Sequence, residues 1–463
     1  MTVLMTACTV PNLVEKSVNT TTPETFNGSQ DTTNTANIKW KDYFTDPYLI
    51  ALIDTALMNN QELNITLQEI QIAQNEVKAR KGEYLPSVSA QAGAGVDKVG
   101  EYTRNGAVEK NLEIKEGKEF PEPLSDFMFG AYANWEVDIW KKLRNAKKSA
   151  MMRYLATVEG KNFMVTNLIS EVANSYYELL ALDNELINVK SNIQILNNAL
   201  KIVKLEKDAA RVTELAVKRF EAEVLKNQSR QYDIQQEIIE TENEINFLVG
   251  RYPQPVERES GLFMDLVPNS IQAGIPAQLI ENRPDIRQAE MELAAAKLDI
   301  KVAKARFYPS LGISAGVGFQ AFNPVYLVEA PQSLLYSLAG DITAPLINRN
   351  AIKADYMSAN AAQIQAVYKY EQTLLNAYIE VVNQLSLINN LERSYNLKSE
   401  QVKALTESIT ISNVLFKSAR ADYMEVLLTQ REALEAKFEL IETKKLQLHA
   451  FVNIYQSLGG GWN

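Results

Sequence analysis

Two long tracts of the chain lack the residues that break helices. Proline is absent from residues 124–252 and 346–463, and glycine is absent from residues 161–249 and 341–458. Inside a helix, a proline costs about 3 kcal/mol and a glycine about 1 kcal/mol. Both tracts are therefore predicted to be helical over most of their length.

Apolar residues in these tracts recur with the spacing of a coiled coil. They step by three or four positions, which keeps them on one face of a helix. They are Val172, Tyr176, Leu179, Leu182, Leu186, Val189 and Ile193 in the first tract, and Val367, Tyr370, Leu374, Tyr378, Val381, Leu385 and Ile388 in the second. Each tract has room for two helices of ~55 residues, about 80 Å long. We expect their turns within residues 204–214 and 416–426.

Four shorter stretches alternate apolar with small or polar residues, which is the period of a β-strand. They are residues 87–97, 127–139, 311–322 and 334–346. Their length, aromatic ends and polar second face match strands of a transmembrane β-barrel. A sandwich strand that faces a soluble core is the alternative for each one alone. Four strands cannot close a membrane-spanning barrel, since the smallest has about eight, so several chains must share one barrel.

The chain contains one internal duplication. GEYLPSVSAQAGAG, which begins at Gly82, matches ARFYPSLGISAGVG, which begins at Ala305. We therefore expect two structural repeats, 41–250 and 271–463, each with a helix, a strand, a loop, a strand and a long helical hairpin. A linker, 251–270, joins them.

The bulk composition excludes several classes of protein. A net charge of −10 argues against a nucleic-acid binder, which usually presents a basic face. One cysteine and one histidine permit neither an internal disulfide nor a zinc site built from three or four Cys and His ligands. Phosphate-binding glycine motifs are absent. No catalytic, metal or cofactor site is visible, so we expect no enzyme and no cofactor.

The single cysteine lies near the N-terminus. Thr6 and Ala7 precede Cys8, and this small-residue pattern resembles the lipobox of a bacterial lipoprotein, in which the cysteine is acylated. We therefore interpret residues 1–8 as the remnant of a lipoprotein signal and Cys8 as the lipidation site. Residues 9–40 are rich in Thr, Asn and Ser, which predicts an extended tether.

Four motifs in order resemble the TolC-like outer-membrane efflux family, in particular its lipoprotein branch, which serves RND-type multidrug exporters. They are WKDYFTDPYLIALI from Trp40, WEVDIWKKLR from Trp135, IPAQLIENRPDIRQAEMEL from Ile275 and SLGGGW from Ser457. Lys141 replaces the glycine that is usual after Trp140. LINRN replaces the family's usual sequence after Pro345.

This resemblance implies a mainly α-helical fold with transmembrane β-structure. Family members are homotrimers in which each chain lends four strands to a twelve-stranded outer-membrane barrel, continued by a long α-helical coiled-coil barrel in the periplasm. The duct is passive. A periplasmic adaptor and an RND-type inner-membrane pump are the expected partners, with outer-membrane lipid and without nucleic acid. We expect a lipid-anchored protein in the outer membrane of a Gram-negative bacterium.

The resemblance also implies a gate at the periplasmic tip. The motif ARADYMEVLLTQ corresponds to the family's pore-closing segment, which points to Asp422 and Glu425 as the constriction. Arg420 and Tyr423 are the candidates for the contacts that keep it shut. A ring of three acidic side chains favours cations. At the other turn, Asp208, Arg211 and Glu214 are candidates for pairing across helices.

Three functions remain in competition at this point. The leading one is the exit duct of a tripartite efflux system for drugs or other small molecules. A type I protein-secretion duct is a close rival, and a trimeric coiled-coil surface fibre is the alternative from another class. The alternative interpretation of the two charged turns is that their side chains are simply solvated by water and do not form a gate.

Overall fold

The computed structural model describes residues 10–14, 16–26, 28, 31–267, 271–347, 349–418 and 420–462. Cys8 lies outside these residues. The chain forms two compact units. The first comprises Met1–Ser17, Gln71–Leu155 and Met291–Tyr368; the second comprises Val18–Ile70, Ala156–Glu290 and Lys369–Asn463. Each unit thus takes segments from both sequence repeats.

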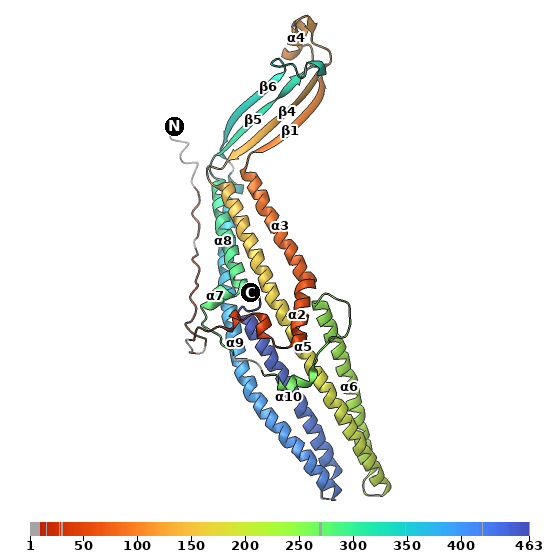
Figure 1. Cartoon of the computed structure of the whole chain (residues 1–463). Coiled ribbons are helices and arrows are strands. Elements are labelled where there is room, and N and C mark those ends of the chain that lie inside the picture. The colour runs from red at the N-terminus through yellow and green to blue at the C-terminus, as the bar shows by residue number, and fades with distance from the viewer. Residues whose placement is uncertain are drawn as a thin grey trace. The chain divides into compact units, whose positions relative to one another are not determined.

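The first unit contains one antiparallel sheet of four strands in the order β1-β4-β5-β6 (Figure 1). The strands are β1 (Ser87–Asp97), β4 (Leu124–Val137), β5 (Ser310–Ala321) and β6 (Leu334–Thr343). β6 ends three residues before the expected position 346. Pro345 has no amide hydrogen to donate, so the ladder does not continue through it.

The register of the sheet separates an apolar face from a polar face. Ala131 lies opposite Ala90 and Val317, and Val317 lies opposite Tyr336. On the other face, Tyr132 lies opposite Ser89. Much of the apolar face is exposed, as the outer strand shows: Tyr336 is 81%, Leu338 80% and Ile342 74% exposed. The single chain therefore leaves an apolar sheet surface uncovered.

The loop between β1 and β4 carries structure that the sequence pattern did not predict. It contains α4 (Arg104–Asn111) and the short strands β2 (Glu113–Lys115) and β3 (Lys118–Glu119). Thr103 caps α4, since its hydroxyl accepts a hydrogen bond from the Gly106 amide. The loop between β5 and β6 begins with a 3₁₀ turn, η4 (Pro324–Tyr326).

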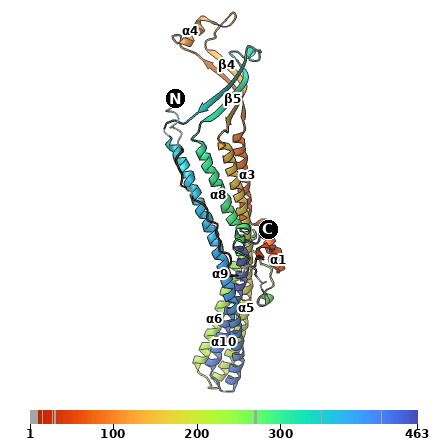
Figure 2. The same cartoon turned by 90° about the vertical axis from the view of Figure 1, so that its left-hand side faces the viewer.

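Two long helical hairpins follow the strand pairs. They consist of α5 (Lys142–Asp208) with α6 (Glu214–Leu248), and of α9 (Asn350–Lys417) with α10 (Tyr423–Ser457). In Figures 1 and 2, α9 runs beside α10 toward their common turn. The turns lie within the predicted segments.

The prediction of equal helices is wrong. α5 and α9 have 67 and 68 residues, whereas α6 and α10 have 35 each. The first helix of each hairpin begins close behind a strand and is therefore extended. The second ends before a glycine in the left-handed region, Gly250 (φ 70°) or Gly459 (φ 89°), where a glycine terminates a helix at low cost.

Shorter helices complete the chain. They are η2 (Thr35–Asn37), α1 (Trp40–Tyr43), α2 (Pro47–Asn59), α3 (Gln61–Tyr84), η3 (Ser260–Asp265), α7 (Gln278–Asn282) and α8 (Pro284–Ala305). Before them the tether lies against helices within each unit. In the first unit Lys16 lies over the ring of Tyr368, and in the second Phe26 stacks on Tyr378. No helix in the described part of the chain is both long and apolar enough to cross a membrane.

Residues of the motif that begins at Trp40 lie in the main hydrophobic core of the second unit. Tyr43 stacks on Phe451 and Tyr455, with ring centroids 4.2 and 4.0 Å apart. Asp46 caps α2, and its other oxygen accepts a 2.7 Å hydrogen bond from the buried Tyr176 hydroxyl. Nine of the fourteen predicted coiled-coil positions are buried, among them Val172, Tyr176 and Val381, and the other five are half-buried: Leu186, Ile193, Tyr378, Leu385 and Ile388.

Arg283, in the motif that begins at Ile275, joins three segments of the chain. Arg283 is buried and donates to Asp285, to Glu380 on α9 and to the Ser457 carbonyl at the end of α10. Acceptors on every side compensate the cost of burying its charge. The motif is therefore a structural junction.

Asp138, in the motif that begins at Trp135, caps the start of α5 in the first unit. Asp138 accepts hydrogen bonds from the amides of Leu143 and Arg144, at 3.0 and 2.9 Å. The turn needs a left-handed residue, and Lys141 occupies that position with φ 61°. A glycine adopts this conformation without strain, which explains why the family usually has one there.

Candidate functional site

The two hairpin turns close in the same way. In the first, the amide of Arg211 donates to the Glu206 carbonyl at 2.8 Å; in the second, the amide of Arg420 donates to Leu415 at 2.9 Å. These bonds span five residues, as in a Schellman motif. The two arginines therefore occupy equivalent positions, 209 residues apart.

The first turn is tied by charge. Glu214 at the start of α6 pairs with Lys207 at the end of α5, at 3.0 Å, and lies 3.9 Å from Lys218. The hydrogen bond that Lys207 donates to the Glu214 carboxylate raises the pKa of Lys207. Asp208 and Arg211 are exposed, and neither forms an ion pair with another described residue. Of the three candidates here, Glu214 is the one that bridges the helices.

The acidic side chains at the second turn neither cap the helix nor form ion pairs with described residues. Asp422 occupies the N-cap position of α10, but its carboxylate accepts no capping hydrogen bond. Aspartate normally caps at that position. Glu425, one turn further, is exposed, as is Arg420. Asp422, Glu425 and Arg420 have no ion pair within the described residues, so their charges are available to solvent or to another chain.

Tyr423 connects the second turn to the first hairpin. Its half-buried ring packs against a cluster that includes Phe220 on α6 and Leu427 on α10. Next to it, Arg219 on α6 lies 2.7 Å from the sulfur of Met424. The start of α10, which carries Asp422 and Glu425, is therefore held against α5 and α6 by packing.

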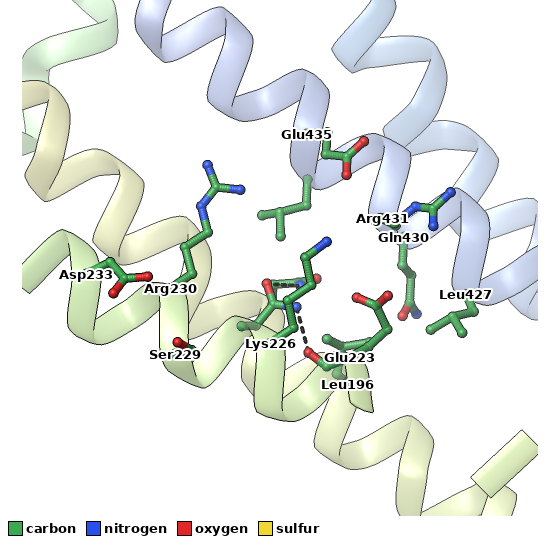
Figure 3. Close-up of a pocket in the computed structure, with 13 residues that line it drawn as sticks. Leu196, Glu223, Lys226, Ser229, Arg230, Asp233, Leu427, Gln430, Arg431 and Glu435 are labelled. Carbon is green, nitrogen blue, oxygen red and sulfur yellow. Dashed lines mark hydrogen bonds between the residues drawn. The ribbon is translucent and has the colours of Figure 1, made fainter. Parts of the chain in front are cut away.

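A pocket of about 420 Å³ lies between α5, α6 and α10 (Figure 3). In it, Asn192 and Asn227 form a buried hydrogen bond of 3.3 Å. Gln430 is 4% exposed, and its Oε1 has no hydrogen-bond partner in the described structure. Figure 3 shows the charged lining residues: Glu223, Lys226, Arg230 and Asp233 on α6, and Arg431 and Glu435 on α10.

Sequence reasoning missed this pocket for a physical reason. Asn192, Asn227 and Gln430 interrupt an otherwise apolar helical pattern, which was the available signal. Nothing local, however, indicates that positions 35 and more than 200 residues apart line the same space. In the described part of the chain, no cluster of three or more His, Cys, Asp or Glu residues is arranged to hold a metal ion.

Comparison with a family of known function gives two matched stretches. The family described as outer membrane efflux protein matches residues 52–251 and 275–460. The two stretches together cover most of the chain.

Individual relatives are similar over nearly their whole length. The chain is 26% identical to the pyoverdine export outer membrane protein OpmQ of Pseudomonas aeruginosa, over 92% of this chain and 87% of that protein. It is 27% identical to the toluene efflux pump outer membrane protein TtgI of Pseudomonas putida, over 94% and 90%. The open-state structure of the MtrE outer membrane channel of Neisseria gonorrhoeae has the same fold, with a TM-score of 0.85, 22% identity and 98% of each chain covered.

Proposed function

Because the chain belongs to the outer membrane efflux protein family, we propose that three copies form one duct whose periplasmic end is closed by Asp422 and Glu425. The protein is an outer-membrane channel that serves as the exit duct of a tripartite efflux system. The exposed apolar face of the sheet is the surface such a channel presents to lipid.

One observation carries the proposed gate. Asp422 and Glu425 are exposed acidic groups that form no ion pair with any described residue, on the helix end that Tyr423 holds against α5 and α6. Around a threefold axis, each becomes a ring of three carboxylates. Such rings raise the local concentration of cations and disfavour anions. Arg420, beside them, is the candidate for a contact with the neighbouring copy that keeps the turn closed.

Conductance in planar lipid bilayers tests the gate. The full chain is compared with Asp422→Asn/Glu425→Gln under a KCl gradient. We expect the wild-type channel to prefer K⁺ and the double variant to lose most of that preference. Asp208→Asn at the other turn is the matched control, and a smaller change is expected there. Equal cation preference in all three proteins would refute the proposed role of Asp422 and Glu425.

The homotrimer is tested separately. Outer-membrane fractions are run unboiled on a denaturing gel. A band at about three times the monomer mass supports a shared barrel, and a monomer band alone contradicts it. A periplasmic adaptor and an RND-type pump are the proposed partners, because the chain's motifs resemble the branch that serves such pumps.

We propose drugs or other small molecules as the exported cargo. Relatives of nearly equal identity carry names that refer to pyoverdine and to toluene. Similarity to either one therefore does not select a substrate. A passive duct receives its cargo from the pump, so the duct's own polar lining needs no specific binding site. We further propose that the chain has no catalytic activity.

Acylation of Cys8 remains a proposal that rests on its lipobox-like neighbours. Metabolic labelling with a palmitate analogue, in a chain expressed with a complete lipoprotein signal, tests it. Label in the wild type and none in Cys8→Ser is the expected result. Label in both would place the lipid elsewhere, and label in neither would contradict acylation.

A further inference from the structure

All four long strands meet the helices at one edge of the sheet. Ser87 lies opposite Asn134, Val137 opposite Leu311, and Ser310 opposite Thr343. The first residues of β1 and β5 and the last residues of β4 and β6 therefore mark one boundary. Since the apolar face of the sheet is the lipid-facing surface, this boundary lies at the membrane surface next to the helices.

The segments along this boundary are strongly basic. Residues 76–84, 136–148, 299–306 and 349–355 contain thirteen Lys or Arg and six Asp or Glu, in a chain with a net charge of −10. The loops at the opposite edge, 98–123 and 322–333, contain five basic and seven acidic residues. We call the four basic segments the collar. Its charge is opposite to that of the chain as a whole.

The acidic residues of the collar all form ion pairs within the first unit. Glu76 and Glu83 pair with Arg80, Glu136 pairs with Lys142, and Asp138 pairs with Arg144. Asp299 and Asp355 pair with Arg153 and Arg306. Eight lysines of the collar have no ion pair among the described residues: Lys78, Lys81, Lys141, Lys147, Lys148, Lys301, Lys304 and Lys353. The excess positive charge of the collar therefore has no counter-charge among the described residues.

An aromatic pocket lies in the same place. Trp140 stacks on Tyr308, with ring centroids 4.7 Å apart, and its indole nitrogen donates to the Pro309 carbonyl at 2.7 Å. Both residues line a pocket of about 270 Å³ together with Lys142 and Arg306. Ile139, which is 50% exposed, also lines this pocket. Amphipathic rings beside cations are the usual composition of a protein surface at the level of lipid headgroups.

We propose that the collar is a binding site for anionic glycerophospholipids, with the lysines of residues 141–148 contacting the headgroup phosphate and Trp140 and Tyr308 packing at the glycerol level. Clusters of four to eight basic residues next to a membrane-spanning element bind anionic lipid in this way. This inference rests on the proposed function only in that the sheet must lie in a membrane. Membrane lipid is the chosen source of phosphate because the pocket lies at the ends of β4, β5 and β6, the strands of the sheet whose apolar side chains are exposed.

Lipid retention by the purified full chain tests the proposal. The chain in neutral detergent is titrated with phosphatidylglycerol or with phosphatidylcholine, and bound lipid is counted by native mass spectrometry. The test variant is Lys141→Gln/Lys147→Gln/Lys148→Gln. The matched control, Lys201→Gln/Lys369→Gln/Lys403→Gln, removes the same charge from exposed sites of the second unit. Inorganic phosphate is added as a competitor in a separate arm.

We expect phosphatidylglycerol to bind more tightly than phosphatidylcholine, and the test variant to lose that affinity about fivefold or more. The control and the phosphatidylcholine affinity should be unchanged. Equal retention of both lipids by the wild type, or equal losses in test and control variants, would overturn the proposal. Displacement of lipid by inorganic phosphate would indicate a free-anion site and would also overturn it.

Folding and function are checked independently. If the triple variant fails to fold, Lys301→Gln/Lys304→Gln on the neighbouring segment provides the same comparison. A variant that still conducts ions in bilayers but has lost the lipid preference supports the site. A wild-type protein that conducts but shows no lipid preference refutes the lipid site and leaves the duct assignment intact.

Discussion

Lys207 and Glu214 form an ion pair across the turn between α5 and α6, with Nζ and Oε2 3.0 Å apart. Because Arg211 and Arg420 are equivalent, the matching positions at the other turn are Phe416 and Tyr423. Charge therefore ties the first turn, whereas Tyr423 packs in an apolar cluster at the second. Salt screens the first contact and leaves the second nearly unaffected.

Tyr423→Ala is expected to loosen the second turn. The substitution removes a half-buried ring from the cluster around Phe220 and costs about 1.5 kcal/mol, less than a fully buried aromatic ring would. Bilayer recordings should show a higher open probability or conductance. Tyr232→Ala, which changes a 70% exposed tyrosine on α6, should leave both unchanged. Similar recordings from the two variants would argue against packing as the closing force.

Lys141→Gly is expected to stabilise the first unit. Lys141 adopts φ 61°, a conformation that costs a residue with a Cβ about 1–2 kcal/mol. Glycine removes that strain but gains freedom in the unfolded chain, so the net gain should be about 0.5–1 kcal/mol. Thermal unfolding followed by circular dichroism measures it. Lys142→Gly, in the first turn of α5, should instead lower the melting temperature; the reverse order would contradict the strain argument.

Arg283→Ala should be strongly destabilising. It leaves the Ser457 carbonyl and the Asp285 carboxylate without their shared donor in a buried place. Losing one partner of a buried ion pair costs about 3–5 kcal/mol. The yield of folded protein and its melting temperature report the loss. Arg80→Ala, which breaks two exposed ion pairs, with Glu76 and Glu83, is the control and should cost about 0.5 kcal/mol or less.

Glu185→Gln should change how stability depends on pH. Burial is the main cause that raises the pKa of Glu185 to about 7; the positive charges of Arg230 and Lys445 oppose the rise, and the negative charges of Glu442 and Glu237 add to it. A raised carboxyl pKa means that the folded state holds the proton more tightly. The contribution of Glu185 to the free energy of unfolding is therefore complete at pH values below the pKa that its carboxyl has in the unfolded chain, and it is lost as the pH rises toward 7.

The variant removes that loss because glutamine does not ionise. At pH 8 it should exceed the wild type by about 1 kcal/mol, a value reduced because the side chain is only half buried. At pH 4 the two should melt alike. The measurement is the melting temperature of both proteins between pH 4 and 8. A constant difference across that range would show that Glu185 does not titrate as stated.

The sequence determined the elements that depend on local patterns. The proline- and glycine-free tracts became the long helices, and alternation predicted β1, β4, β5 and β6. The turns fell within the expected segments, and the four motifs led to the right family. These features are readable because helix and strand periods act over a few neighbouring residues.

Only the tertiary structure decided which distant residues meet. The partner of Glu214 across the turn is Lys207 rather than Arg211. Asp46 meets Tyr176 across 130 residues. The Asn192, Asn227 and Gln430 pocket and the basic collar arise in the same way. Each brings together separate segments of the chain, and packing free energy, which no local pattern encodes, selects those neighbours.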